Sequence, residues 1–154
     1  MSRVFFLFLS FFLSLNLSAQ KNKIDVVFFF ENLPQLNNSN IEEWIKSPEL
    51  IDECKACIGF LEMRKSDFVK NLGDKLACFK SGRNKLEQEI LKEPDNVSFR
   101  FLRFIIQEHA PKIVNYHADM NNDLTKIKLN YKMMKPYIQQ AIIDYSKQSR
   151  NLKL

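Results

Sequence analysis

The chain has 154 residues, of which 45% are hydrophobic and 27% are charged, with a formal net charge of +5. This length suits one domain, and only three glycines and five prolines argue against a β sandwich with many turns. Helices joined by short loops are therefore favoured. We expect an all-α protein of about six or seven helices, arranged as stacked antiparallel hairpins.

The first residues predict a secretory signal peptide. Arg3 precedes an apolar run over residues 4–17, and small residues near Ala19 suit cleavage. A transmembrane helix needs roughly 20 apolar residues, and this run is shorter. We therefore expect residues 1–20 to be removed. Residues 21–154 would then form one helical domain that is periplasmic or secreted and not transmembrane.

Three helices are predicted in the first part of that domain. Residues 24–33 form an apolar run that ends at a proline, and we expect a short helix because no strand partner exists for it. Residues 41–45 are predicted as a second short helix after a polar linker. Ser47 and Pro48 are typical of a helix start, and the third helix is predicted to run unbroken to about Arg64.

Two helices that meet at a proline turn are predicted to form the core. The first begins near Ser66 and ends at Pro94, and its apolar residues recur with helical spacing. The second covers residues 97–109 and is apolar around most of its circumference, as is typical of a central helix. The residues of the first helix that we expect in the core are Phe68, Leu72, Leu76, Phe79, Leu86 and Ile90.

The last part of the chain predicts two further helices. Apolar residues from Met120 onward follow heptad spacing, but Pro136 interrupts the pattern and suits the first turn of a new helix. We therefore expect helices over residues 119–131 and 136–147. A single kinked helix that docks on a partner is the alternative.

The basic excess lies at the end of the chain. From Lys126 onward, seven basic residues face one acidic residue, Asp144. We expect a solvated helix face and a frayed basic tail over residues 148–154. Weak contact of these lysines with an anionic surface is the other interpretation, because an exported protein meets lipid or polysaccharide more readily than nucleic acid. No nucleic-acid partner is expected.

The middle of the chain carries a recognisable set of residues. They are Lys80-x-Gly82, Leu86-Glu87, Ile90, Pro94-x-Asn96, Arg100-Phe101-Leu102-Arg103, Ile106-Gln107 and Pro111. This stretch covers about the middle half of the predicted mature chain, and it resembles a family of uncharacterised small exported proteins of flavobacteria and related Bacteroidetes. The resemblance implies no particular activity.

The same stretch is similar to a tetratricopeptide unit, in which a small residue, a large apolar residue and a proline close the second helix. Gly82, Leu86 and Pro94 have suitable spacing, whereas Glu89 stands where a small residue is usual. No repeat of 34 residues is visible elsewhere. The likeness implies stacked helix pairs and, more weakly, a protein or peptide partner.

Arg100, Arg103 and Gln107 fall on one polar stripe of the predicted central helix. Arginines that emerge from an apolar helix either pair with nearby acids or bind an anionic group of a ligand. We favour pairing with carboxylates such as Glu87 or Glu93. The leading functional hypothesis is a non-enzymatic binding or scaffolding module of the cell envelope, with a groove lined by this stripe.

Cys54 and Cys57 form a CxxC motif, which occurs in redox proteins and in zinc sites. A helix that starts at Ser47 places both cysteines well inside it, away from the N-terminal end that lowers a thiol pKa. We therefore expect buried packing residues. Because helices carrying Cys57 and Cys78 can lie antiparallel, we predict a Cys57–Cys78 disulfide with Cys54 free. A periplasmic redox or carrier protein that uses Cys54 and Cys57 is the alternative function.

The remaining candidate sites are incomplete. Asp119, Asn121 and Asp123 resemble the first oxygen ligands of an EF-hand, but the glycine and the final glutamate of that loop are missing. No nucleophile elbow, HExxH motif or phosphate-binding loop accompanies His109 or His117. We therefore predict no enzymatic activity, no metal site and no cofactor.

Overall fold

A computed structural model describes residues 23–154, and this part of the chain is entirely helical, which confirms the all-α prediction. The predicted signal peptide, residues 1–20, lies outside the described residues. The described part holds eight α-helices, rather than about six or seven, and four short 3₁₀ turns. The α-helices are α1 (Val26–Asn32), α2 (Asn38–Trp44), α3 (Pro48–Glu53), α4 (Lys55–Lys65), α5 (Leu72–Lys92), α6 (Val97–His109), α7 (Met120–Asn130) and α8 (Pro136–Gln148). The 3₁₀ turns are η1 (Leu33–Gln35), η2 (Ser66–Phe68), η3 (Lys112–Val114) and η4 (Tyr131–Met133).

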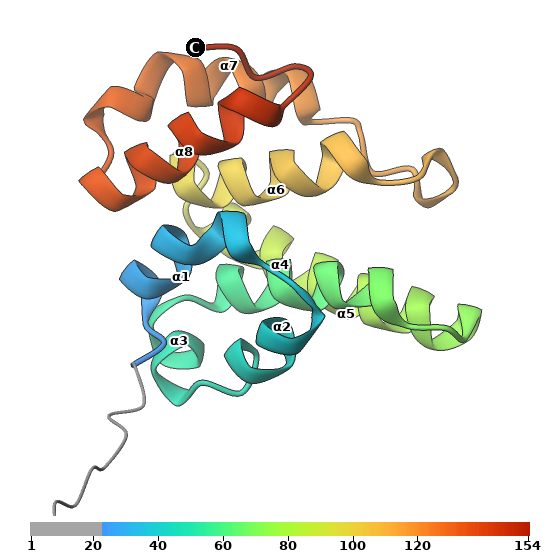
Figure 1. The fold of residues 1–154 in the computed structure, drawn as a ribbon. Helices are drawn as coiled ribbons and strands as arrows, with labels where there is room; N and C mark the ends of the chain where they lie inside the picture. Colours follow the sequence, from blue (N-terminus) through green and yellow to red (C-terminus); the bar gives the residue numbers. More distant parts are fainter. Residues whose placement is uncertain (1–22) are drawn as a thin grey trace, which may run out of the picture.

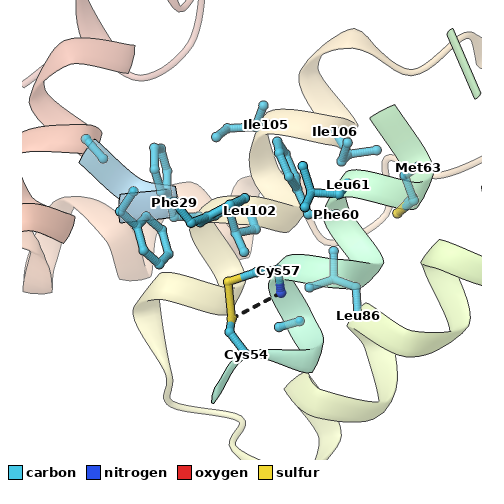
Figure 2. Close-up of a cluster of buried hydrophobic side chains, with 14 of the residues drawn as sticks. Phe29, Cys54, Cys57, Phe60, Leu61, Met63, Leu86, Leu102, Ile105 and Ile106 are labelled. Atoms are coloured by element: carbon cyan, nitrogen blue, oxygen red, sulfur yellow. Dashed lines mark hydrogen bonds between the residues drawn. A yellow bond between two sulfur atoms is a disulfide. The ribbon is translucent and has the colours of Figure 1, made fainter. Parts of the chain in front are cut away.

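The helix α4 lies at the centre of the fold. It packs against α2, α3, α5 and α6, while α6 also packs against α7. Figure 1 shows α2 to α5 in one group and α6 to α8 in another, and α1 contacts both α3 and α8. The apolar core fills the space between these helices, and Phe29, Phe60 and Leu102 are each at most 1% exposed there (Figure 2).

The helix that the sequence predicts over residues 48–64 is broken at Cys54. This residue has φ −149° and ψ 82°, so α3 ends before it and α4 begins after it. The sulfur of Cys54 accepts a hydrogen bond from the backbone N–H of Cys57 at 3.1 Å. Because the first N–H groups of a helix have no partner within the helix, this sulfur satisfies one of them and fixes the start of α4.

The helices α4 and α5 approach so closely that their backbones touch. Gly59 of α4 faces Gly82 of α5 at the contact. A Cβ atom added to Gly59 would lie 2.7 Å from the carbonyl oxygen of Gly82 and 2.8 Å from the backbone nitrogen of Leu86. Only glycine fits at these two positions without moving the helices apart.

The helix α6 has the bounds that the sequence predicts, residues 97–109. Asn96 caps it, since its side-chain oxygen accepts hydrogen bonds from the backbone N–H groups of Ser98 and Phe99. The helix is buried on most sides between α4 and α7, as expected of a central helix. Neither α6 nor any other helix within residues 23–154 has the length and apolar character needed to cross a membrane.

The two-helix interpretation of the last part of the chain is confirmed. The helix α7 ends at Asn130, and α8 begins at Pro136 with the proline in its first turn. The 3₁₀ turn η4 separates them, which excludes the alternative of one kinked helix.

The C-terminal tail is held in place, so the prediction of a frayed end is wrong. The hydroxyl of Ser149 donates to Oε1 of Glu108 at 2.7 Å, and the backbone N–H groups of Arg150 and Asn151 donate to the same oxygen at 2.9 Å. Leu152 is fully buried beyond them. The sequence does not reveal this clamp, because Glu108 stands more than 40 residues before the groups that it binds.

This clamp predicts a pH dependence of stability. Burial alone would raise the pKa of Glu108, but hydrogen bonds from Tyr145, Ser149 and Asn151 outweigh it and lower the pKa below its ordinary value of 4.5. A carboxylate with a lowered pKa stabilises the fold above that ordinary value, and the contribution is lost as the pH falls through the lowered pKa.

We therefore expect Glu108→Gln to lower the free energy of unfolding at neutral pH by about 1 kcal/mol, a small value because the carboxylate is partly exposed. The difference between the variant and the natural protein should shrink as the pH falls below 4.5 and through the lowered pKa of Glu108. Urea denaturation across this range measures it. A difference that stays constant with pH would contradict the assignment to Glu108.

Candidate functional site

Two arginines of the polar stripe share one buried carboxylate. Arg100 Nη1 lies 2.8 Å from Asp123 Oδ1, while Arg103 Nε lies 2.7 Å from Oδ2 and Arg103 Nη2 lies 2.8 Å from Oδ1. Asp123, on α7, is fully buried. Pairing with Glu87 is confirmed, since Arg103 Nη1 donates to it at 2.8 Å, but Glu87 is a secondary partner. The main partner, Asp123, is not among the carboxylates that the sequence predicts.

The prediction that Arg100, Arg103 and Gln107 line an open groove is wrong. Their exposed fractions are 7%, 4% and 1%, because α7 covers the stripe with the Asp123 carboxylate. Burial by itself lowers the pKa of the Arg103 guanidinium, but the hydrogen bonds and charge of Asp123 outweigh burial and raise it. Arg103 therefore remains charged, and both arginines hold α6 against α7 through Asp123.

Gln107 provides a test of this structural role. Its side-chain oxygen is buried and has no hydrogen-bond partner within residues 23–154. A buried amide oxygen without a partner costs free energy, so Gln107→Met should leave stability unchanged or raise it by about 1 kcal/mol. Thermal and urea denaturation measure the change. A clear loss of stability would instead indicate that this side chain serves the fold through its polar group.

The predicted disulfide between Cys57 and Cys78 is also wrong. Cys54 and Cys57 are bonded to each other, with their Cα atoms 5.2 Å apart. The break between α3 and α4 explains the difference, since Cys54 leaves the helical backbone and its side chain turns towards Cys57 (Figure 2). Cys78 is a free thiol that donates to the carbonyl oxygen of Glu62 at 3.1 Å, and burial raises its pKa.

An apolar groove lies between the start of α5 and η3. Its cavity measures about 290 Å³, and it is lined mainly by apolar side chains from α4, α5, α6 and η3. Large apolar residues at the rim of the groove are exposed to solvent: Leu72 is 70% exposed, Leu76 is 38% exposed and Ile113 is 91% exposed. In Figure 1 the connection between α4 and α5 and the segment after α6 project on the same side of the molecule.

A second cavity, of about 310 Å³, adjoins this groove. It lies between η1, α4, α6 and α8, and it shares Arg64 and His109 with the first cavity. The hydroxyl of Tyr145 donates to Glu108 at 2.5 Å and lies 3.1 Å from Nε2 of His109. Burial and the Glu108 carboxylate raise the pKa of Tyr145, which keeps it a neutral donor. The two cavities together, here called the α5–η3 groove, thus combine apolar walls with polar groups at their junction.

The sequence contained a sign of this groove that its interpretation missed. Leu72 and Leu76 belong to the apolar stripe predicted as core, and Phe68 precedes them, yet all three are exposed. The reason is that α5 begins at residue 72 with Asn71 as its cap, and its first turns carry this stripe to the surface. Exposed apolar side chains that line a cavity are typical of binding surfaces.

A third cavity lies at the junction of α3 and α4. It measures about 640 Å³ and is open to solvent. Cys54 lines it together with acidic residues, including Glu93 and Asp95, and with Lys135 from the start of α8. The disulfide therefore borders this cleft at one edge, although Cys54 itself is only 3% exposed.

The remaining candidate residues have structural contacts. Nε2 of His117 lies 3.0 Å from the carbonyl oxygen of Ala110 and ties the segment after α6 to the end of that helix. Asp123, considered as a calcium ligand, is occupied by the two arginines. Within residues 23–154, no three His, Cys, Asp or Glu side chains gather in a way that could hold a metal ion.

Comparisons with protein-family models, with curated proteins and with solved structures found no match for this chain.

Proposed function

We propose that the protein is an exported, non-enzymatic binding module that takes an apolar, acidic segment of another protein in the α5–η3 groove. The observation that carries this proposal is a cavity whose rim consists of exposed apolar side chains, those of Leu72, Leu76 and Ile113. Water contact of such side chains is unfavourable, and burying them against a partner removes it.

The charge of the groove favours an acidic partner. Its lining includes the cations Arg64 and Lys75 and the ionisable His109, against one acid, Asp67. Arg64 Nη1 lies 3.0 Å from Asp67, but both side chains are partly exposed, and such a pair is weak. A carboxylate of the partner can therefore compete for Arg64, while apolar side chains fill the groove.

Export and helical stacking belong to the same proposal. Disulfides persist in oxidising compartments, so the Cys54–Cys57 bond supports a periplasmic or secreted location, as the N-terminal sequence does. The resemblance to small exported proteins of flavobacteria points the same way. The packing of α4 on α5, α6 on α7 and α4 on α6 supports two stacked hairpins, loosely like a tetratricopeptide array.

Selection from a random peptide display library tests the groove. We expect the enriched peptides to combine apolar residues with Asp or Glu. They should bind the double variant Leu72→Ser/Ile113→Ser, and separately the variant Arg64→Gln, at least about tenfold more weakly than the natural protein. The reason is that a desolvated apolar contact or ion pair is worth more than about 1.4 kcal/mol of binding free energy. Leu91→Ser is the matched control, because Leu91 is 79% exposed and lines neither cavity of the groove. Peptides that bind all variants equally would refute the assignment.

A second candidate function, thiol–disulfide exchange, is favoured by the position of the CxxC motif. Cys54 caps α4, and the N–H of Cys57 that bonds its sulfur would also stabilise a Cys54 thiolate. In the exchange, two thiols of a partner protein would be oxidised to one disulfide while Cys54 and Cys57 become thiols. Because both cysteines are buried, thiol–disulfide exchange is less favoured than the binding function proposed for the α5–η3 groove.

The reduction potential of the Cys54–Cys57 disulfide separates exchange from a structural bond. Equilibration in glutathione buffers, followed by thiol labelling and mass measurement, gives the potential. A value above about −200 mV would support exchange, whereas one below about −300 mV is typical of a structural disulfide and would exclude it.

A further inference from the structure

A basic and apolar patch lies where α7 meets η4. Leu129 is 74% exposed and Met133 is 76% exposed, and they stand four residues apart in sequence, near the end of α7 and at the end of η4. Lys128 and Lys132 precede them in sequence and are exposed as well. We call these four residues the α7–η4 patch. In Figure 1 the turn between α7 and α8 lies at the end of the molecule opposite to the connection between α4 and α5.

The charge of the patch is not neutralised by its own segment. Residues 124–143 contain four lysines and no acidic residue. Of these lysines, Lys126 pairs with Asp95 at 2.5 Å, whereas the ion pairs found within residues 23–154 include neither Lys128 nor Lys132. Lys135 stands at the border, beside the cleft that contains Glu93 and Asp95.

The shape of the patch distinguishes a lipid surface from a folded partner. Leu129 and Met133 are mostly exposed to solvent and line none of the three cavities described above. A membrane interface accepts protruding apolar side chains without a complementary cavity, while lysines extend their ammonium groups to the headgroups. Lysines near an anionic leaflet add an attraction that salt weakens.

We propose that the α7–η4 patch docks the protein on the surface of an anionic lipid bilayer. Leu129 and Met133 enter the interface, and Lys128 and Lys132 bind the lipid phosphates from the sides. The four residues of the patch line neither cavity of the α5–η3 groove, so this contact leaves the groove free and does not depend on the function proposed for it.

Sedimentation with lipid vesicles tests the proposal. The chain is prepared from Lys21 onward, which contains the whole described fold and omits the apolar N-terminal run that would enter lipid by itself. We expect it to sediment with vesicles containing phosphatidylglycerol, and not with phosphatidylcholine vesicles. Raising salt from about 0.05 M to about 0.5 M should release it.

Paired variants assign the contact to the patch. Lys128→Gln/Lys132→Gln should weaken partitioning about 30-fold, and Leu129→Ser/Met133→Ser should weaken it at least about tenfold. All four positions are exposed, so the variants should keep the circular dichroism and urea midpoint of the natural protein. The matched control is Lys80→Gln/Leu91→Ser, which removes an exposed lysine and a 79% exposed leucine from α5.

Three outcomes would overturn the proposal. The chain does not sediment with phosphatidylglycerol vesicles; it sediments equally with phosphatidylcholine; or the control variant loses as much binding as the patch variants. The peptide-binding result is a separate readout, since Leu129 and Met133 lie outside the groove.

Discussion

Asp123→Asn is expected to lower the free energy of unfolding by about 3 to 5 kcal/mol, the loss typical of removing one partner from a buried ion pair. The substitution keeps the size of the side chain but leaves the guanidinium groups of Arg100 and Arg103 buried without their shared carboxylate. Arg103 keeps its ion pair with Glu87, which reduces the loss of stability for that arginine but not for Arg100. Urea denaturation at neutral pH measures the change.

A combined variant shows whether the loss comes from isolated charge. Replacing Arg100 and Arg103 by methionine and Asp123 by leucine removes all three charges together, and we expect stability within about 1 kcal/mol of the natural protein or above it. Asp144→Asn, in the exposed pair with Lys147, should change little. If the combined variant were as unstable as Asp123→Asn, the contribution of the triad would lie in its hydrogen-bond geometry.

Gly82→Ala is expected to destabilise the fold by about 2 to 3 kcal/mol, although alanine favours a helix by about 1 kcal/mol over glycine. The new methyl carbon would overlap the carbonyl oxygen of Gly59 and lie 2.7 Å from the backbone nitrogen of Met63. Neither backbone atom can move without separating α4 from α5. Thermal denaturation should show a midpoint lowered by several degrees.

Gly73→Ala is the matched control for Gly82. Gly73 lies in the first turn of the same helix, and a Cβ there would meet only the side-chain oxygen of Asn71, at 3.2 Å. We expect a change near zero. Equal destabilisation by both substitutions would show that loss of glycine anywhere in α5 matters, rather than the contact with Gly59.

The sequence predicted those parts of the fold that are encoded locally. The bounds of α6 follow from the cap at Asn96 and the stop at Ala110 before a proline, and both signals stand next to the helix. The two C-terminal helices follow from Pro136 in the same way. By contrast, the helical spacing of the apolar residues continues across Cys54, so no signal nearby in the chain predicts the break between α3 and α4.

The candidate site depended on contacts that a local pattern does not contain. Asp123 is 20 residues after Arg103 and resembled one of the oxygen ligands of an EF-hand, so its role as the buried partner was missed. The disulfide prediction failed because it assumed an unbroken helix through Cys54. Helical spacing showed that Leu72 and Leu76 share a stripe with core residues, but it cannot show which part of a stripe lacks a neighbouring helix.

The close contact of α4 with α5 has a consequence for the order of folding. Gly59 and Gly82 are near in sequence, so little loop-closure entropy opposes their meeting, whereas α1 and α8 join segments about 100 residues apart. We expect the pair α4–α5 to form first and the packing of Phe30 against Tyr137, 6.1 Å between ring centres, to form late. Native-state hydrogen exchange should then be slowest in α4 and α5 and fastest in α1, which would make the N-terminal helix the first part of the fold to open.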